Sequence, residues 1–199
     1  MESIVQYKKL FESYGGVMRT KELRAERVFY CSVQWLIKEG YITKIKTGLY
    51  RWGQVNKSDE IKLITKLFPD GVICRESALY IYGYLENKPS EWHIAVNKDS
   101  GKSRFQIDFP KVKPHYTQSK MLSIGMTNIE AEGAFIRIYD RERTLCDCIK
   151  YRNKLTNSIF QKVLKSYTLD TQKNTLLLLE YAEQLRVKKY TQNLVGAWN

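Results

Sequence analysis

Apolar residues in the first forty positions recur at the three- and four-residue spacing of amphipathic helices. The pattern predicts three helices, and Gly40 would end the third. The residues that indicate them are Ile4, Tyr7, Phe11 and Tyr14 for the first, Thr20 as the cap of a short second, and Phe29, Val33, Leu36 and Ile37 for the third. No Ser, Thr, Asp or Asn precedes Phe29, so the third helix is expected to begin without a capping side chain.

After Gly40, polar and apolar residues alternate, which predicts a β-hairpin. Lys44 and Lys46 lie on its first strand, Thr47-Gly48 would form the turn, and residues 49–52 would return. Three helices followed by a hairpin is the order of a winged helix-turn-helix. In such a domain the third helix enters the major groove of DNA and the hairpin, the wing, lies against adjacent phosphates.

A polar line on the third helix, formed by Arg27, Cys31, Gln34 and Lys38, suits this reading, because Gln can pair with adenine and Lys with phosphate. The candidate DNA-binding residues are Thr20, Lys21, Arg27, Tyr30, Ser32, Gln34, Lys38, Lys44, Lys46 and Arg51. An ordinary solvated helix face, or a wing used for packing between domains, would show the same residue types.

Beyond a short polar joint at residues 54–58, helices and strands follow one another. The expected elements are a helix at 59–68, a turn at Pro69-Asp70-Gly71, a helix with Ala78, Ile81, Tyr82 and Leu85 on one face, strands at 92–96, 105–109 and 135–139, a helix from Tyr139-Asp140, and two more capped by Asn157 and Asp170. The predicted fold class is α+β: a winged helix-turn-helix at 1–57, then a larger mixed α/β domain at 58–199 with a small sheet and a helical C-terminus.

In the helix that begins near Asp140, Leu145, Cys148 and Ile149 would point inward. Arg143, Asp147, Lys150 and Lys154 then fall on the opposite side at helical spacing. Asp147 lies one helical turn from both Arg143 and Lys150, which is typical of a surface or domain-joining ion pair; such a pair is worth roughly 0.3–0.5 kcal/mol when it is exposed.

The net charge of +12 favours a polyanionic partner, nucleic acid above all. Its distribution is uneven, because residues 1–57 carry 11 Lys and Arg against 5 Asp and Glu, residues 58–136 carry 10 against 10, and residues 137–199 carry 12 against 6. The second basic region, 137–199, could extend a nucleic-acid surface beyond the winged helix.

The four cysteines do not form a metal-binding pattern. Cys146 and Cys148 would point about 200° apart on a helix, so they cannot converge on one ion. We therefore expect no metal and no cofactor, and interpret Cys31, Cys74, Cys146 and Cys148 as small buried hydrophobes.

The sequence has no apolar run near the ~20 residues of a membrane helix and no secretory signal after Met1, which favours a cytoplasmic protein without a membrane partner. It has no glycine-rich phosphate loop, and neither His93 nor His115 has a nucleophile near it in sequence, so we predict no enzymatic activity. An alternative is a metal-dependent nucleic-acid-processing enzyme that a winged helix targets, since Asp70 and Glu86-Asn87-Lys88 resemble a carboxylate-carboxylate-lysine pattern; a turn and a helix end explain both carboxylates equally well.

Several segments together resemble the AbiEi-type antitoxins of bacterial type IV toxin–antitoxin and abortive-infection systems. They are "GGVMRTKELRAE", "WLIKEGYITKIKTGLYRW", "ICRESALYIYGYLENKPSEWHIAVNKDSGKSRF" and "DRERTLCDCIKYRNKL". The last matches the family's Glu-Arg-Thr-Leu, Asp and Tyr-Arg-Asn signature at Arg143, Thr144, Asp147, Tyr151, Arg152 and Asn153.

This resemblance implies a winged helix that binds operator DNA and represses its own operon. Because helix-turn-helix proteins often read paired half-sites, we expect an inverted repeat in the operator if a dimer or two monomers bind there. The resemblance also implies a C-terminal domain with antitoxin activity. The functional partner would be a nucleotidyltransferase-like AbiEii toxin, which such antitoxins oppose without a tight direct complex.

Overall fold

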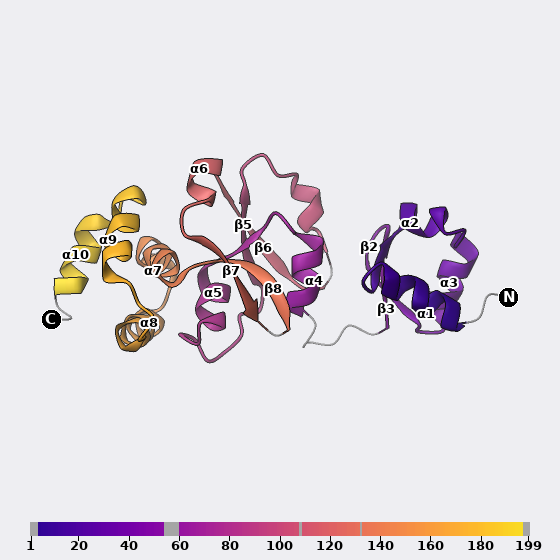
Figure 1. The fold of residues 1–199 in the computed structure, drawn as a ribbon, viewed down its shortest axis with the longest axis horizontal. Coiled ribbons are helices and arrows are strands. Elements are labelled where there is room, and N and C mark those ends of the chain that lie inside the picture. The colour runs from indigo at the N-terminus through magenta and orange to yellow at the C-terminus, as the bar shows by residue number, and fades with distance from the viewer. Residues whose placement is uncertain (1–3, 54–59, 108, 132, 197–199) are drawn as a thin grey trace. The chain divides into compact units, whose positions relative to one another are not determined.

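The structure is a computed structural model that describes residues 4–53, 60–107, 109–131 and 133–196. The chain divides into two compact units, Met1–Glu60 with Gln106–Phe109 and Ile61–Phe105 with Pro110–Asn199 (Figure 1). The expected joint at residues 54–58, and with it the expected domain boundary, lies outside the described residues.

The first unit is a winged helix-turn-helix, as predicted. Its elements are α1 (Ile4–Ser13), β1 (Val17–Arg19), α2 (Thr20–Ala25), α3 (Tyr30–Lys38), β2 (Ile42–Lys46) and β3 (Leu49–Trp52). The strands form an antiparallel sheet in the order β1-β3-β2, in which β2 and β3 are the predicted wing. The sequence pattern had not indicated β1.

The core of this unit gathers apolar residues from all three helices and the sheet, including Phe11, Met18, Leu23 and Leu36. The expected inner position of Phe29 is wrong. Phe29 is the N-cap of α3 and is 63% exposed, while Val28 points into the core in its place. Arg27 lies in the turn before α3, with φ of 57°, and not on the helix itself.

The ends of α2 and α3 follow from backbone hydrogen bonds. The N-cap of α2 is Arg19 rather than Thr20, and the Glu22 carboxylate accepts a hydrogen bond from the Arg19 N–H at 2.6 Å. Gly40, with φ of 76°, closes α3 in a Schellman motif, because Tyr41 N–H donates to Leu36 and Gly40 N–H to Ile37. As expected, no side chain caps the start of α3.

The second unit is built on a mixed sheet in the order β6-β5-β4-β8-β7. Its strands are β4 (Val72–Ile73), β5 (Trp92–Asn97), β6 (Val112–Thr117), β7 (Met126–Ala131) and β8 (Ala134–Tyr139). The pairs β5–β6 and β4–β8 are parallel, and β4–β5 and β7–β8 are antiparallel. The strands predicted at 92–96 and 135–139 are confirmed as β5 and β8.

The strand expected at 105–109 is wrong. Phe105 ends a 3₁₀ helix, Lys102–Phe105, and stacks on Phe68 with ring centroids 5.1 Å apart. The strand that follows this segment in the sequence, β6, pairs with β5 on the side opposite β4.

The helices of this unit cover the sheet. They are α4 (Glu60–Leu67), α5 (Arg75–Ile81), α6 (Ser119–Leu122), α7 (Arg141–Lys150), the 3₁₀ helix Arg152–Lys154, α8 (Asn157–Leu169), α9 (Thr175–Gln184) and α10 (Lys188–Gly196). Figure 1 shows α4 on the side of the sheet opposite α7 to α10. Since both faces are covered, Trp92 to Val96 of β5 are buried without alternation.

Side chains cap three of the C-terminal helices. Asp140 accepts a hydrogen bond from Arg143 N–H at the start of α7, Thr156 from Ile159 N–H in α8, and Asn174 from Leu177 N–H in α9. The expected caps Asn157 and Asp170 are therefore wrong: Asn157 is the first residue of α8, and Asp170 ends it.

The buried face of α5 differs from the predicted one. Ser77 and Leu79 are buried together with Ala78, and Leu85 lies beyond the end of the helix. In the part of the chain that the structure describes, no helix has the length and apolar character to cross a membrane.

Candidate functional site

The outer face of α3 carries three of the candidate DNA-binding side chains in one line. Tyr30, Gln34 and Lys38 are exposed and four residues apart, so they share a face of the helix. Lys21 on α2 is exposed, whereas Thr20 and Ser32 are half-buried. If α3 entered a major groove with this face, Tyr30, Gln34 and Lys38 would be the side chains that contact the DNA.

The wing carries the remaining cations on its two faces. Lys44 is exposed, and Lys46 and Arg51 are half-buried. Arg51 is paired with Thr43 in the strand register, so it lies on the face opposite Lys44. A phosphate backbone along one face of the wing would thus meet Lys44 rather than Arg51.

Sequence reasoning missed exposed aromatic residues around α3. Phe29 and Trp35 are exposed together with Tyr30, and Trp35 packs against Tyr41 with ring centroids 5.7 Å apart. The position of Trp35 could have been inferred, since it follows Cys31 by one turn. Cys31 is itself exposed, which corrects its interpretation as a buried hydrophobe; the other three cysteines are buried.

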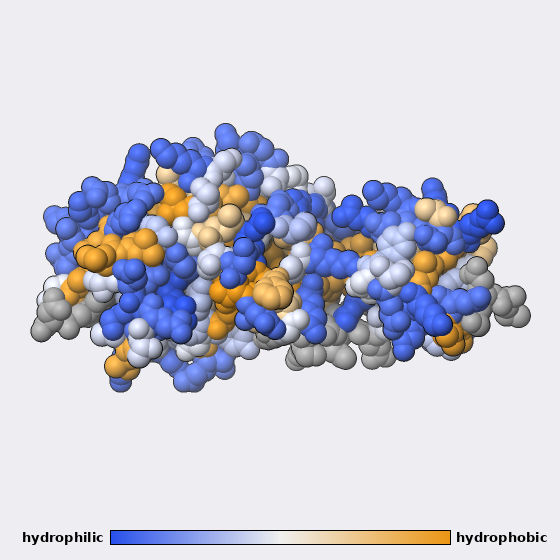
Figure 2. Space-filling model, in the orientation of Figure 1, coloured by the Kyte–Doolittle hydropathy of each residue, from blue (hydrophilic) through white to orange (hydrophobic). Residues whose placement is uncertain are grey.

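Hydrophilic residues cover most of the face of the molecule that Figure 2 shows, and hydrophobic residues gather there in separate patches. One patch lies over α9, a helix whose Leu176 is 82% exposed. The surface of the second unit is therefore not uniformly charged, although the chain is rich in lysine and arginine, because exposed hydrophobic residues lie between the charged ones.

The signature on α7 is buried, which corrects the expectation of an outer line. Arg143 and Asp147 are 5% and 6% exposed, with Arg143 Nε 3.2 Å from Asp147 Oδ1. Arg143 Nη1 also donates to the carbonyls of Met121 and Ile124, both at 2.8 Å. The guanidinium thus joins α7 to the segment that leads into β7.

The backbone beside Arg143 approaches it closely at Gly125. Gly125 has φ of 68°, and a Cβ there would collide with the Cβ of Arg143. The carbonyl of Gly125 also accepts the N–H of Asp140, at 2.7 Å. The chain therefore fixes the start of α7 through Gly125, Asp140 and Arg143 together.

The other signature residues are divided between structural contacts and a cavity. Thr144 is buried and its hydroxyl donates to the carbonyl of Tyr139 at 3.2 Å. Arg152 lies 4.4 Å from the centroid of the Tyr190 ring and donates to the carbonyl of Ile149. Asn153 is exposed, and Tyr151 lines the cavity described next.

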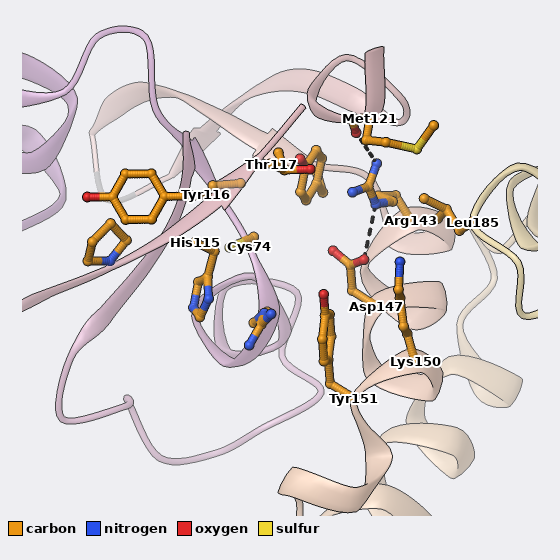
Figure 3. Close-up of a pocket in the computed structure, with 14 residues that line it drawn as sticks. Cys74, His115, Tyr116, Thr117, Met121, Arg143, Asp147, Lys150, Tyr151 and Leu185 are labelled. Carbon is orange, nitrogen blue, oxygen red and sulfur yellow. Dashed lines mark hydrogen bonds and ion pairs between the residues drawn. The ribbon is translucent and has the colours of Figure 1, made fainter. Parts of the chain in front are cut away.

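A cavity of about 370 Å³ lies between α7, the start of α5 and strand β6 (Figure 3). Its lining includes Arg75, His115, Arg143, Asp147, Lys150 and Tyr151. In Figure 3, Asp147, Lys150 and Tyr151 extend from α7 and its end toward the space that His115 faces from β6. Burial raises the pKa of the Asp147 carboxyl, although Arg143, Arg75 and Lys150 oppose this shift.

A chain of hydrogen-bonding groups borders this cavity. His93 Nδ1 lies 2.9 Å from Glu76 Oε2 and 3.1 Å from His115 Nε2. Burial alone would raise the pKa of Glu76, but its hydrogen bond to His93 and the charges of His93 and Arg75 lower it to about 2. Burial, followed by the charge of Arg75, lowers the pKa of His115 to about 3, so His115 is neutral at pH 7.

The two carboxylates of the nuclease-like pattern take part in ion pairs. Asp70 lies in the predicted turn and is held by Arg104, whose Nη1 is 2.8 Å from Asp70 Oδ2. Glu86 Oε1 lies 2.7 Å from Lys162 Nζ. Among the described residues, no group of three or more His, Cys, Asp and Glu side chains is placed to hold a metal ion.

Many cations of the second basic region are also engaged within the unit. Arg141 pairs with Asp170 at 2.8 Å, Lys162 with Glu86, and Lys188 with Glu183 at 3.0 Å. Because these cations have carboxylate partners, the number of lysines and arginines in this region overstates the number of unpaired positive charges there.

The fold described here is of the α+β class, with a winged helix-turn-helix followed by a five-stranded mixed sheet and a helical C-terminus. It is similar to the crystal structure of the RV2827C protein from Mycobacterium tuberculosis, with 11% sequence identity and a TM-score of 0.54; the match covers 95% of this chain and 78% of that chain. No family model and no curated protein matches the sequence. At this identity the likeness concerns the fold alone.

Proposed function

We propose that this protein is a DNA-binding transcriptional repressor that controls its own operon and acts as the antitoxin of a bacterial type IV toxin–antitoxin or abortive-infection module. The observation that carries the DNA-binding part is the exposed line Tyr30, Gln34 and Lys38 on α3, next in sequence to a wing with an exposed Lys44. These are the elements with which winged helices contact a groove and its phosphates.

The antitoxin part is supported by the sequence signature of AbiEi-type antitoxins. In this proposal the protein acts in the cytoplasm by binding rather than by catalysis, without a cofactor. It opposes a nucleotidyltransferase-like toxin without forming a tight complex with it. Its DNA ligand is an operator with an inverted repeat, because helix-turn-helix proteins read paired half-sites.

The DNA-binding part is tested by gel-shift titration on the upstream region at several salt concentrations. If roughly five to eight phosphates are contacted, log K falls with log salt at about −0.9 per contact. The double variant Lys44→Ala/Lys46→Ala should reduce the magnitude of this slope by about two, because each lysine removes one contact. The charge-matched control Lys98→Ala/Lys102→Ala changes two exposed lysines of the second unit and should keep the wild-type slope.

A separate variant distinguishes base contacts from phosphate contacts. Gln34→Ala should narrow the difference in affinity between the operator and a scrambled duplex by about 1–3 kcal/mol, because Gln34 would contact a base edge. The wing variant should weaken binding to both duplexes alike. Wild-type affinity and slope in the wing variant would refute the wing contact.

The antitoxin part is tested by expressing the neighbouring open reading frame with and without this protein. Growth should be rescued by the wild type and equally by Lys44→Ala/Lys46→Ala, since neutralisation is assigned to the second unit. Failure of the wild type to rescue would leave a repressor without antitoxin activity. Magnesium-dependent cleavage of nucleic acid that Asp70→Ala or Glu86→Ala abolishes would instead favour the enzymatic alternative.

A further inference from the structure

The cavity beside α7 has no part in the proposed contact with DNA, which uses the first unit. A second hollow of about 310 Å³ adjoins it, because Arg75, Pro114, His115, Asp147 and Tyr151 line both. Binding sites for small molecules usually measure about 300–1,000 Å³. The larger cavity alone therefore has the size of a site for a small molecule.

Cations gather around one aromatic ring where the two hollows meet. The guanidinium carbon of Arg75 lies 3.8 Å from the centroid of the Tyr151 ring, Lys154 Nζ lies 5.7 Å and Lys150 Nζ 6.0 Å from it. Within the described part of the chain, no carboxylate lies within 4.0 Å of any of these three cations. Three cations held against one ring raise the positive potential of the lining, and such a potential favours a bound anion.

The two hollows are lined by two carboxylates, Asp147 and Glu76, and by five cations, so the carboxylates offset only part of the positive charge. Asp147 is paired with Arg143, and Glu76 with His93. The low pKa of His115 agrees with a positive local potential, since burial and then Arg75 are its main causes. The lining therefore presents an excess of positive charge together with a neutral imidazole.

Two further features of the lining are unusual in a purely structural region. Tyr139 is 1% exposed, and its buried hydroxyl has no hydrogen-bond partner among the described residues. Arg75 has φ of 51°, a backbone conformation that costs energy in a non-glycine residue. Unsatisfied buried polar atoms and strained backbones concentrate at functional sites.

We propose that this cavity binds a phosphorylated small molecule of the size of a mononucleotide. The phosphate lies among Arg75, Lys150 and Lys154, and the organic part fills the larger hollow beside His115. Tyr151, a residue of the family signature whose role the sequence does not reveal, then serves as the platform on which Arg75 is held.

The test is isothermal titration calorimetry of the full chain with AMP, GMP, CMP and UMP, and separately with inorganic phosphate. At least one mononucleotide should bind, and Lys150→Gln and Arg75→Asn should each raise its Kd about tenfold or more. Asn tolerates a positive φ, so Arg75→Asn removes the guanidinium without adding backbone strain. Lys165→Gln, an exposed lysine on α8 outside both linings, is the matched control and should keep the wild-type Kd.

Circular dichroism would show that both variants keep the fold. The proposed site would be refuted if no probe gave a heat of binding at millimolar concentration, or if both variants bound the nucleotide with the wild-type Kd. Inorganic phosphate binding as tightly as the nucleotides would overturn the role of the organic part. Tighter binding of a short single-stranded RNA, lost in the same variants, would assign the cavity to a nucleic-acid strand instead. Operator binding by Lys150→Gln in the gel shift should stay at the wild-type level, so the two proposals can fail separately.

Discussion

Helices α3 and α7 carry polar side chains at the same spacing but in opposite environments. On α3, Gln34 and Lys38 are four residues apart and exposed; on α7, Arg143 and Asp147 are four residues apart and buried. The difference comes from the neighbours, because α7 contacts α5, α8, α9 and α10 while one side of α3 remains uncovered. Helical spacing shows which side chains share a face, and only the tertiary structure shows whether that face meets water.

The two environments give these side chains different energetic roles. An exposed polar side chain contributes little to stability and is available to a ligand. A buried ion pair gives little net stability, but removing one partner leaves an uncompensated charge. The following variants test this contrast.

The largest effect is expected from Asp147→Ala. This variant leaves the buried guanidinium of Arg143 without its carboxylate and should destabilise the second unit by about 3–5 kcal/mol. The matched change on α3, Lys38→Ala, should stay within about 0.5 kcal/mol. Urea denaturation followed by circular dichroism measures both. The double variant Arg143→Met/Asp147→Leu should be more stable than Asp147→Ala. A loss of stability in Asp147→Ala as small as that in Lys38→Ala would show that the pair is not buried in solution.

An intermediate effect is expected from Glu76→Gln, and it depends on pH. Because the pKa of Glu76 is lowered from 4.5 to about 2 in the folded protein, its ionised form stabilises the fold by up to about 3 kcal/mol. This contribution is complete above the unfolded pKa and is lost as the pH falls toward about 2. Glu76→Gln should therefore be less stable than the wild type at pH 7, and the difference should shrink between about pH 5 and pH 2.

Thermal unfolding at several pH values checks the Glu76 prediction. Glu12→Gln is the control, since Glu12 forms an exposed pair with Lys8 at 3.9 Å and should change stability by less than about 0.5 kcal/mol at any pH. A stability difference for Glu76→Gln that does not vary with pH would contradict the assigned pairing with His93.

The smallest effect is expected at the helix caps. Phe29→Ser gives α3 a side chain that can cap it and should stabilise the first unit by about 1 kcal/mol, because Phe29 buries little surface there. Thr156→Ala removes the cap of α8 and should cost the second unit a similar amount. Urea denaturation measures the two changes, and effects of equal sign would refute the capping argument.

The sequence was most informative where periodicity was strong and turns were clear. The wing, with its turn at Thr47-Gly48, was predicted as it is found. Strand β6 was missed because it lies at the edge of the sheet, mixes half-buried and exposed residues and contains Pro114, which edge strands tolerate. The two-residue strand β4 is too short to leave a periodic pattern.

The candidate sites were predictable to different extents. Helical spacing alone predicts the exposed line on α3, but it misplaced Arg27 and did not reveal the exposed Phe29 and Trp35. The cavity could not be predicted, because Arg75, His115 and Lys150 come from α5, β6 and α7 and have no common motif. The resemblance to AbiEi-type antitoxins drew attention to Tyr151, but the cationic neighbours of Tyr151 depend on how α5 packs against α7.

Gly125 makes the second unit unusually sensitive to the addition of a single methyl group. Alanine at this position would require both an unfavourable left-handed backbone and displacement of α7 at Arg143. Saturation mutagenesis should therefore recover glycine alone at position 125, although this residue lies outside the signature and carries no side chain of its own.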